Sequence, residues 1–324
     1  MNHKILPYVC LTVFLTTSIT LAGPTTNRKA SFLPQWMPQS QFAGYYVAYE
    51  KGIYKKYGLD ITIMQGGPDS PPGRMLKNGA VDFTTMWLSS AIKENESGPK
   101  IVNIAQMVQK SALILIAKKS SGIKTPKDIN NKKVGLWDGV FKIQPSAFFK
   151  KFGLKVKIVP QSYSVNLFLR GGVDVASAMW YNEYHTILNS GYEPEELTTF
   201  FYYNYGLNFP EDGIYTRRDF FEKNPELCRD FVRASLEGWQ YAFEHPEETI
   251  GIMLKYMKAA HIPANRAHQK WMLDRMEDLM TDGISARPVG RLSESGYTNV
   301  LNLLQESGLI NSSSQFKDFY HVCE

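Results

Sequence analysis

Short apolar stretches alternate with stretches of helical periodicity along the first two thirds of the chain. The apolar stretches are bounded by turn residues, as where Leu59, Ile61 and Ile63 precede the breaking sequence Gly66-Gly67-Pro68, and this pattern is typical of strands. The predicted strands are residues 30–35, 58–65, 80–84, 133–137, 155–160 and 173–179, and the predicted helices between them are 43–49, 73–78, 145–152 and 165–170. Strands that alternate with helices of this size predict an α/β protein with parallel sheets and helices on both faces.

The same plan occurs twice. Asn78-Gly79-Ala80-Val81-Asp82 in the first half and Arg170-Gly171-Gly172-Val173-Asp174 in the second both read as helix, turn and strand. Within segment 101–118, the apolar run 112–117 is strand-like and long enough to cross between two lobes, and a second crossing is expected at 206–216. Each lobe is therefore predicted to be a mostly parallel sheet with flanking helices, and a ligand is expected between the lobes. The predicted boundaries are 23–113 for the first part of lobe 1, 114–211 for lobe 2, and 212–324 for the return of lobe 1.

From Asn224 onward the chain reads as helical. Asn224-Pro225 places a capping residue before a proline at the first helical position, and residues 226–244 carry apolar residues at helical spacing. Further helices are predicted to begin at His245 and over residues 264–280. These helices are expected to pack back on the first lobe.

The N-terminus resembles a secretory signal rather than part of the core. Lys4 precedes an apolar run over residues 5–16, and Thr20 and Ala22 stand at the −3 and −1 positions of a cleavage site. The alternative, an uncleaved anchor, is disfavoured because the run is short for a bilayer span. We therefore predict a cleaved signal peptide over residues 1–22 and a periplasmic or extracytoplasmic protein.

Composition excludes several classes of function. The 324 residues include 44% hydrophobic and 21% charged residues, and the formal net charge of +5 is spread along the chain. Without a long basic block, nucleic-acid binding is not expected. Cys228 and Cys323 remain after cleavage, and they could form one disulfide or stay as two thiols.

Catalytic and metal-binding motifs are also missing from the sequence. The six histidines show no paired metal spacing, and there is no P-loop, no dinucleotide-binding glycine motif and no nucleophile elbow. No catalytic residue, metal or cofactor is predicted.

The candidate ligand contacts follow predicted strands. Trp36 lies in the loop after the first strand, with Gln39 and Gln41 before the next helix, and open α/β sheets place ligands at such strand ends. Three further tryptophans also follow strands, namely Trp87, Trp137 and Trp180. These rings are predicted to stack on a planar ligand, although some of them could simply fill the core between the lobes.

Several short motifs, in order, carry a resemblance to a known family. They include Trp36-x-Pro38, Lys51-Gly52-Ile53-Tyr54, Tyr57-Gly58-Leu59-Asp60, Lys142-Ile143-Gln144 and His245-Pro246-Glu247. Between Ser31 and Met257 the chain resembles type II periplasmic solute-binding proteins. The matching branch contains the thiamine-pyrimidine-precursor binding proteins of ABC importers and the fungal thiamine pyrimidine synthases, and it is related to nitrate, sulfonate and taurine binding proteins.

The resemblance implies a transport function. It implies that the Trp36 loop stacks on a flat heterocycle and that groups of the second lobe, here Asn182 and Glu183, bind the edge of the ring, with Gln39, Gln41 and Gln144 able to serve likewise. The partners implied are an ABC permease and its ATPase subunits, and a monomer is expected. A second reading is a ligand-sensing module that acts with a separate membrane kinase.

The synthase reading is disfavoured at specific positions. When the chain is aligned on Val81-Asp82, the lysine that carries the cofactor in those enzymes corresponds to Met86, and the sacrificial histidine corresponds to Ser90. The cysteine cluster would fall near residues 203–213, which contain no cysteine. We therefore expect a binding protein and not an enzyme.

Overall fold

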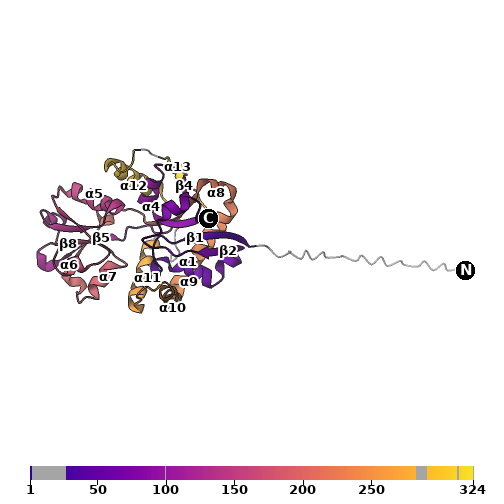
Figure 1. The fold of residues 1–324 in the computed structure, drawn as a ribbon, viewed down its shortest axis with the longest axis horizontal. Helices are drawn as coiled ribbons and strands as arrows, with labels where there is room; N and C mark the ends of the chain where they lie inside the picture. The colour runs from indigo at the N-terminus through magenta and orange to yellow at the C-terminus, as the bar shows by residue number, and fades with distance from the viewer. Residues whose placement is uncertain (2–26, 99, 282–289, 312–313, 324) are drawn as a thin grey trace.

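The computed structural model describes residues 1, 27–98, 100–281, 290–311 and 314–323. The predicted signal peptide, residues 1–22, lies outside the described residues apart from Met1. Two five-stranded sheets form the centres of two lobes, which lie side by side (Figure 1).

The sheet of lobe 1 has the strand order β2-β1-β3-β10-β4. Its strands are β1 (Arg28–Leu33), β2 (Leu59–Ile63), β3 (Phe83–Trp87), β4 (Ile101–Gln106) and β10 (Asp212–Arg217). β1 pairs in parallel with β2 and β3, whereas β10 is antiparallel to β3 and β4. The helices between these strands are α1 (Ala43–Glu50), α2 (Ile53–Lys56), α3 (Pro72–Lys77) and α4 (Leu88–Glu94), and α8 (Arg218–Lys223) follows β10.

The sheet of lobe 2 repeats this arrangement in the order β7-β6-β8-β5-β9. Its strands are β5 (Leu113–Lys118), β6 (Lys133–Leu136), β7 (Lys157–Pro160), β8 (Val175–Met179) and β9 (Leu197–Phe201), and its helices are α5 (Ile143–Phe152), α6 (Asn166–Leu169) and α7 (Glu183–Leu188). β6 is parallel to β7 and β8, and β5 is antiparallel to β8 and β9. In each lobe the first strand after a crossing is thus the single antiparallel strand. The prediction of two α/β lobes with mostly parallel sheets is confirmed.

Several details differ from the sequence-based expectation. The strand predicted over residues 80–84 is displaced to Phe83–Trp87, and β4 and β9 were not predicted. The run 112–117, which was expected to cross between the lobes, forms most of β5 inside lobe 2. The displacement arises because residues 79–82 form a turn that is held by the neighbouring strand, where the Ser31 amide and hydroxyl both donate to the Asp82 carboxylate at 2.8 Å.

The two lobes are joined by non-strand segments, residues 107–112 and 206–211, that bind each other. The Val108 amide donates to the Asp212 carbonyl at 3.0 Å, and the Glu211 amide donates to the Val108 carbonyl at 3.2 Å. Because the two crossings are hydrogen-bonded side by side, they form one narrow connection between two larger bodies. Such a connection is a suitable place for a hinge.

The C-terminal helices pack mainly on lobe 1. They are α9 (Pro225–Glu244), α10 (Pro246–Ala259), α11 (Arg266–Met280), α12 (Glu294–Glu306) and α13 (Phe316–Phe319). α9 crosses α1 so closely that a Cβ atom at Gly44 would lie 2.2 Å from the Trp239 ring, and one at Gly238 would lie 2.3 Å from the Gly44 carbonyl oxygen. Only glycine fits at this crossing.

Two further findings concern the whole described chain. Cys228 and Cys323 are both buried and free. None of the helices in the described ranges is long and apolar enough to cross a membrane.

Candidate ligand-binding site

Aromatic side chains from the two lobes meet where strands end. Trp36, in the loop after β1, contacts Tyr163 of lobe 2 edge-on, with ring centroids 5.0 Å apart. Trp87, the last residue of β3, contacts Phe141 of lobe 2 edge-on at 4.7 Å. Trp137, directly after β6, lies 6.0 Å from the same Phe141 ring. These five rings define the aromatic part of the interlobe site.

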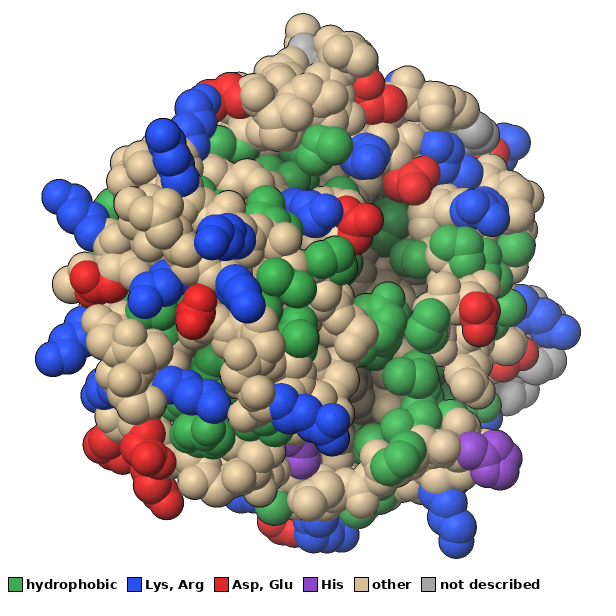
Figure 2. All heavy atoms as spheres, turned by 60° about the vertical axis from the view of Figure 1, so that its left-hand side comes forward, with side chains coloured by type: hydrophobic (Ala, Val, Ile, Leu, Met, Phe, Trp, Pro, Cys, Tyr) green, Lys and Arg blue, Asp and Glu red, His purple; other side chains and the backbone are tan. Residues whose placement is uncertain are grey.

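The rings extend from the surface to the core. Tyr163 is 68% exposed, whereas Trp87 and Trp137 are buried. The Trp137 indole is held in place because its Nε1 donates to the Ser162 carbonyl at 3.0 Å. Figure 2 shows a furrow bordered by hydrophobic side chains on a face of the molecule.

A buried carboxyl group, that of Asp212, lies beside Trp87. Asp212 is the first residue of β10 and pairs directly with Trp87 across the strands. Its Oδ2 accepts from Gln41 Nε2 at 2.8 Å, and its Oδ1 accepts from Gln35 Nε2. Gln39 extends this series of hydrogen bonds, since its Nε2 donates to Gln41 Oε1 at 2.6 Å.

The partners of Asp212 in the described part of the chain are all neutral. Burial is the main cause that raises the pKa of Asp212 to about 7, and the hydrogen bonds oppose it only in part. A buried carboxyl group without a cation is costly. A ligand that brings an N–H group or a positive charge would offset that cost.

Glu211, the neighbouring carboxyl group, lies in the connection between the lobes. It accepts from the Ala112 amide at 2.7 Å and from the Leu113 amide at 3.1 Å. Burial, and secondly the charge of Asp212, raise the pKa of Glu211 well above its usual range. Gln144 is also committed here, because its Nε2 donates to the Leu207 carbonyl at 2.9 Å and its Oε1 accepts from the Ser111 hydroxyl at 3.1 Å.

Asn182 and Glu183 bind protein groups. Glu183 accepts from the Met179 amide at 2.9 Å and from Asn182 Nδ2 at 3.0 Å, and burial raises the pKa of Glu183 to about 7. The other amide atom, Asn182 Oδ1, lies 2.9 Å from Nε2 of His268. In this state both side chains stabilise the contact between lobe 2 and α11.

Trp180 also lies in the contact between lobe 2 and α11. Its ring lies edge-on to Phe201 at 5.4 Å, and the Arg275 guanidinium lies 5.0 Å from its centroid. The ring is therefore engaged by lobe 2 and by α11, away from the contacts of the other three tryptophans.

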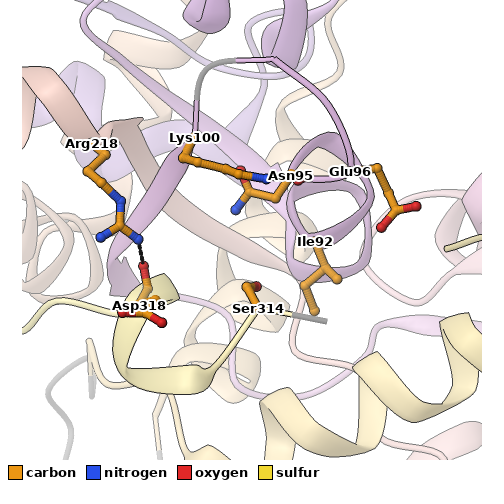
Figure 3. A pocket seen from close by; sticks show the side chains of 7 residues that line it. All are labelled: Ile92, Asn95, Glu96, Lys100, Arg218, Ser314 and Asp318. Atoms are coloured by element: carbon orange, nitrogen blue, oxygen red, sulfur yellow. Dashed lines mark hydrogen bonds between the residues drawn. The ribbon is translucent and has the colours of Figure 1, made fainter. Parts of the chain in front are cut away.

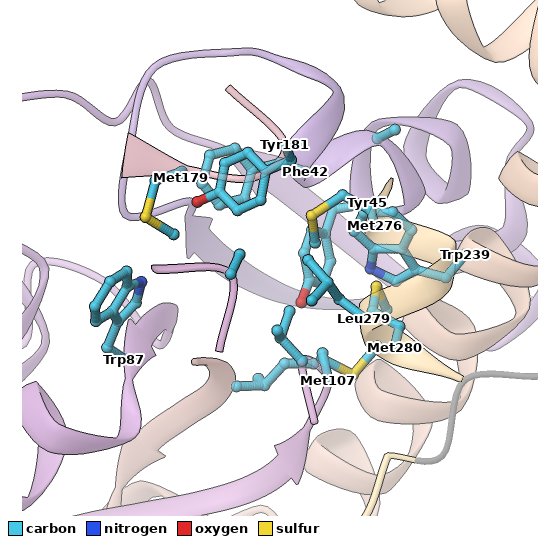
Figure 4. Packing of buried hydrophobic residues seen from close by; sticks show 14 of the residues in the cluster. Phe42, Tyr45, Trp87, Met107, Met179, Tyr181, Trp239, Met276, Leu279 and Met280 are labelled. Carbon is cyan, nitrogen blue, oxygen red and sulfur yellow. The ribbon is translucent and has the colours of Figure 1, made fainter. Parts of the chain in front are cut away.

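Two buried tyrosines, Tyr45 and Tyr181, also lie near Asp212. The Tyr45 hydroxyl makes no hydrogen bond of ordinary geometry within the described residues. Burial is the main cause that raises the pKa of both phenols, and the charge of Asp212 adds to it. Figure 4 shows Trp87 and Tyr181 on one side of a buried cluster that also includes Tyr45, Met276 and Leu279.

The nine predicted residues thus fall into three places. The first group lies around the aromatic rings and Asp212 and consists of Trp36, Trp87, Trp137, Gln39 and Gln41. Gln144 lies at the connection between the lobes, and Trp180, Asn182 and Glu183 lie against α11. Sequence reasoning missed Asp212, Tyr181, Phe141 and Tyr163. The acidic pair Glu211-Asp212 in the second predicted crossing segment is the sequence signal that could have singled out the first of these.

A second hollow lies elsewhere on lobe 1. It has a volume of about 450 Å³ and is lined by residues of α4, of the loops around β4, and of the C-terminal segment (Figure 3). The two cationic side chains that line it are hydrogen-bonded to the protein backbone. Lys100 Nζ donates to the Asn95 carbonyl at 2.5 Å, and Arg218 donates to the Asp318 carbonyl. Within the described ranges, no group of three or more His, Cys, Asp or Glu side chains could hold a metal ion.

Comparisons with known proteins show which family the chain resembles in sequence and in fold. The chain is 22% identical over 296 residues to a riboflavin-binding protein of Chloroflexus aurantiacus, covering 89% of this chain and 83% of that protein. It is 20% identical to a formylaminopyrimidine-binding protein of Halalkalibacterium halodurans, covering 70% of each chain.

Its fold matches that of the periplasmic aliphatic sulphonate binding protein SsuA of Escherichia coli. The TM-score is 0.67 at 16% identity, over 89% of this chain and 90% of that one. The sequence profile of the family described as NMT1/THI5 like matches residues 39–249. The chain has a periplasmic-binding-protein fold and belongs to the NMT1/THI5-like family.

Proposed function

We propose that this protein is the extracytoplasmic substrate-binding protein of an ABC importer and that it captures a small planar nitrogen heterocycle between its lobes. One observation carries the proposal: aromatic rings from both lobes converge beside a buried carboxyl group, Asp212, whose partners are neutral. The names of two relatives support the class of ligand, since riboflavin and formylaminopyrimidine are both planar nitrogen heterocycles.

Each part of the site then has a role. Trp36, Trp87 and Trp137 would stack on the faces of the ring, and a stacked aromatic pair contributes about 0.5–1.5 kcal/mol beyond its buried area. Asp212 would accept an N–H group at the edge of the ring, and Gln39 and Gln41 would hold that carboxylate or bind the ring themselves. Binding would favour the closed arrangement of the lobes, which the permease and its ATPase subunits would recognise.

The remaining predicted residues act at closure in this proposal. Gln144 stabilises the hinge, while Trp180, Asn182 and Glu183 fix lobe 2 against α11. A catalytic role finds no support at the positions that the synthases use. Met86 is buried in an apolar cluster of lobe 1, and an aldimine requires a lysine there.

The test is a binding screen on ligand-free protein. The mature chain is unfolded, washed and refolded, and its melting temperature and tryptophan fluorescence are followed with aminopyrimidines, thiamine, riboflavin and taurine. At 100 times the dissociation constant a ligand stabilises the protein by about 2.7 kcal/mol. We expect a planar heterocycle to bind and taurine to have no effect.

Two variants and a control make the test specific. We expect Trp36→Ala and Asp212→Asn each to weaken binding by about tenfold or more. Tyr49→Ala, which removes a 45% exposed aromatic ring on α1, should bind as the wild type does. Binding of a heterocycle that is unchanged in both site variants would contradict the proposed site, and preferential binding of taurine would contradict the proposed class of ligand.

A further inference from the structure

Helix α11 contacts both lobes, although the chain places it in the C-terminal segment. On the lobe 1 side, Gln269 Oε1 accepts from the Ser40 amide at 2.7 Å, and Met272 Sδ accepts from the Gln41 amide at 3.2 Å. Both contacts hold the loop that carries the predicted ligand-binding amides. The helix is therefore fixed to lobe 1 at the edge of the interlobe site.

The opposite contacts of α11 are made to lobe 2. His268, Trp271 and Arg275 are spaced three and four residues apart, so they share one face of the helix. Trp271 Nε1 donates to the Trp180 carbonyl at 3.1 Å, and Arg275 lies over the rings of Trp180 and Trp271 at 5.0 and 4.6 Å. The Trp271 ring stacks on His185 at 4.9 Å.

His268 binds lobe 2 through both ring nitrogens. Its Nε2 lies 2.9 Å from Asn182 Oδ1, and its Nδ1 lies 2.9 Å from His185 Nδ1. Since Asn182 Nδ2 donates to Glu183, the Oδ1 atom of Asn182 accepts, and Nε2 of His268 must carry a hydrogen. Nδ1 of His185 also lies 3.1 Å from the Asn189 side-chain amide nitrogen, and the two histidine Nδ1 atoms form a hydrogen bond when one of them carries a hydrogen.

These contacts join the lobes without any ligand. We propose that His268, with His185 and Asn182, forms a closure latch that stabilises the closed arrangement of the lobes and so raises the apparent ligand affinity without touching the ligand. The predicted effect of the latch on ligand affinity rests on the proposed function. The predicted effect on the distance between the lobes does not. If the closed arrangement is the one that binds, the apparent dissociation constant varies inversely with its population.

The main experiment measures the distance between the lobes in the ligand-free full-length mature chain. Spin labels are placed at two exposed positions, one on each lobe, by Asp60→Cys and Lys127→Cys. Double electron–electron resonance then gives the distance distribution. We expect the wild type to populate a short distance and His268→Ala to lose a large part of it, by a factor of roughly five to thirty in the closed-to-open ratio for one or two lost hydrogen bonds.

The variants separate a latch from a fold defect. His185→Ala removes the partner from lobe 2 and should have a similar effect, and the double variant should lose little more than either single one. His268→Gln keeps an N–H donor toward Asn182 and should restore part of the short distance. His261→Ala, at an exposed histidine in the loop before α11, is the matched control and should leave the distribution unchanged.

The binding readout uses the heterocycle found in the screen, with riboflavin as the first probe. His268→Ala should weaken every bound heterocycle by the same factor, because it acts through closure. The latch is overturned if His268→Ala and His185→Ala fold normally and keep the wild-type distance distribution. If the distance changes as expected but no heterocycle binds to the wild type, the proposed ligand fails and the latch stands.

Discussion

Replacing Asp212 by asparagine should make the ligand-free protein more stable at alkaline pH while it weakens ligand binding. Asp212 is 4% exposed, and burial raises the pKa of its carboxyl group from 3.8 to about 7. Between these two values the folded protein keeps a proton that the unfolded chain releases. Because the folded state binds more protons, stability falls as the pH rises through this window.

The magnitude follows from the size of the shift. One pKa unit corresponds to about 1.4 kcal/mol, so the raised pKa of Asp212 destabilises the folded wild type by about 4 kcal/mol at pH 8. Asparagine has nearly the same shape and no charge, and the amides of Gln35 and Gln41 can turn to present an oxygen to its NH2 group. We therefore expect a variant that is about 2–4 kcal/mol more stable than the wild type at pH 8 and similar to it near pH 4.

The assay is urea unfolding of ligand-free protein, followed by tryptophan fluorescence at pH 4.5, 6 and 8. Glu183, whose pKa is also raised to about 7 by burial, contributes the same pH dependence to both proteins. The difference between variant and wild type therefore isolates Asp212 and its influence on Glu211. A difference that does not change with pH, or a variant that is less stable at pH 8, would refute the reasoning.

Two further predictions concern the helix crossing and the latch. Gly44→Ala should lower the free energy of unfolding by about 1–3 kcal/mol or more, because its Cβ would overlap the Trp239 ring. Gly251→Ala, in an open helical position, should leave the free energy of unfolding unchanged or raise it by about 0.5–1 kcal/mol. Thermal melting of both variants compares them directly. Burial, and secondly His185, lower the pKa of His268 to about 4 in the closed form. If His268 is exposed in the open form, its pKa there is near the ordinary value of about 6.5, and closure releases a proton between these two pH values. The closed population should therefore grow as the pH rises from about 4 to 6.5. Interlobe distances at both ends of this range test this, and His268→Gln should show a smaller change.

Much of the fold could be predicted because its signals are local. A strand such as β2 is visible in the alternation of Leu59, Ile61 and Ile63, and α9 is visible in its cap and its helical spacing. The repeated plan of the halves then required two similar lobes. β9 escaped prediction because its sequence, Leu-Thr-Thr-Phe-Phe, becomes a strand only beside β5.

The candidate site was predicted in part for the same reason. Trp36, Gln39 and Gln41 follow a strand in one continuous stretch, so their place at a sheet edge could be inferred from the sequence. Asp212 could not, since it is 171 residues from Gln41 and becomes a neighbour of Trp87 only through the antiparallel return of β10.

The two lobes, the aromatic strand ends and the amides that precede α1 could therefore be read from the order of residues alone. The groups that these side chains contact depend on how distant segments pack together. The partner of Asn182 is His268, 86 residues away on a helix of the other lobe's C-terminal segment. The physical reason is that backbone periodicity is set by neighbours in the chain, whereas the burial and pairing of a polar side chain are set by whichever elements the sheet order brings together.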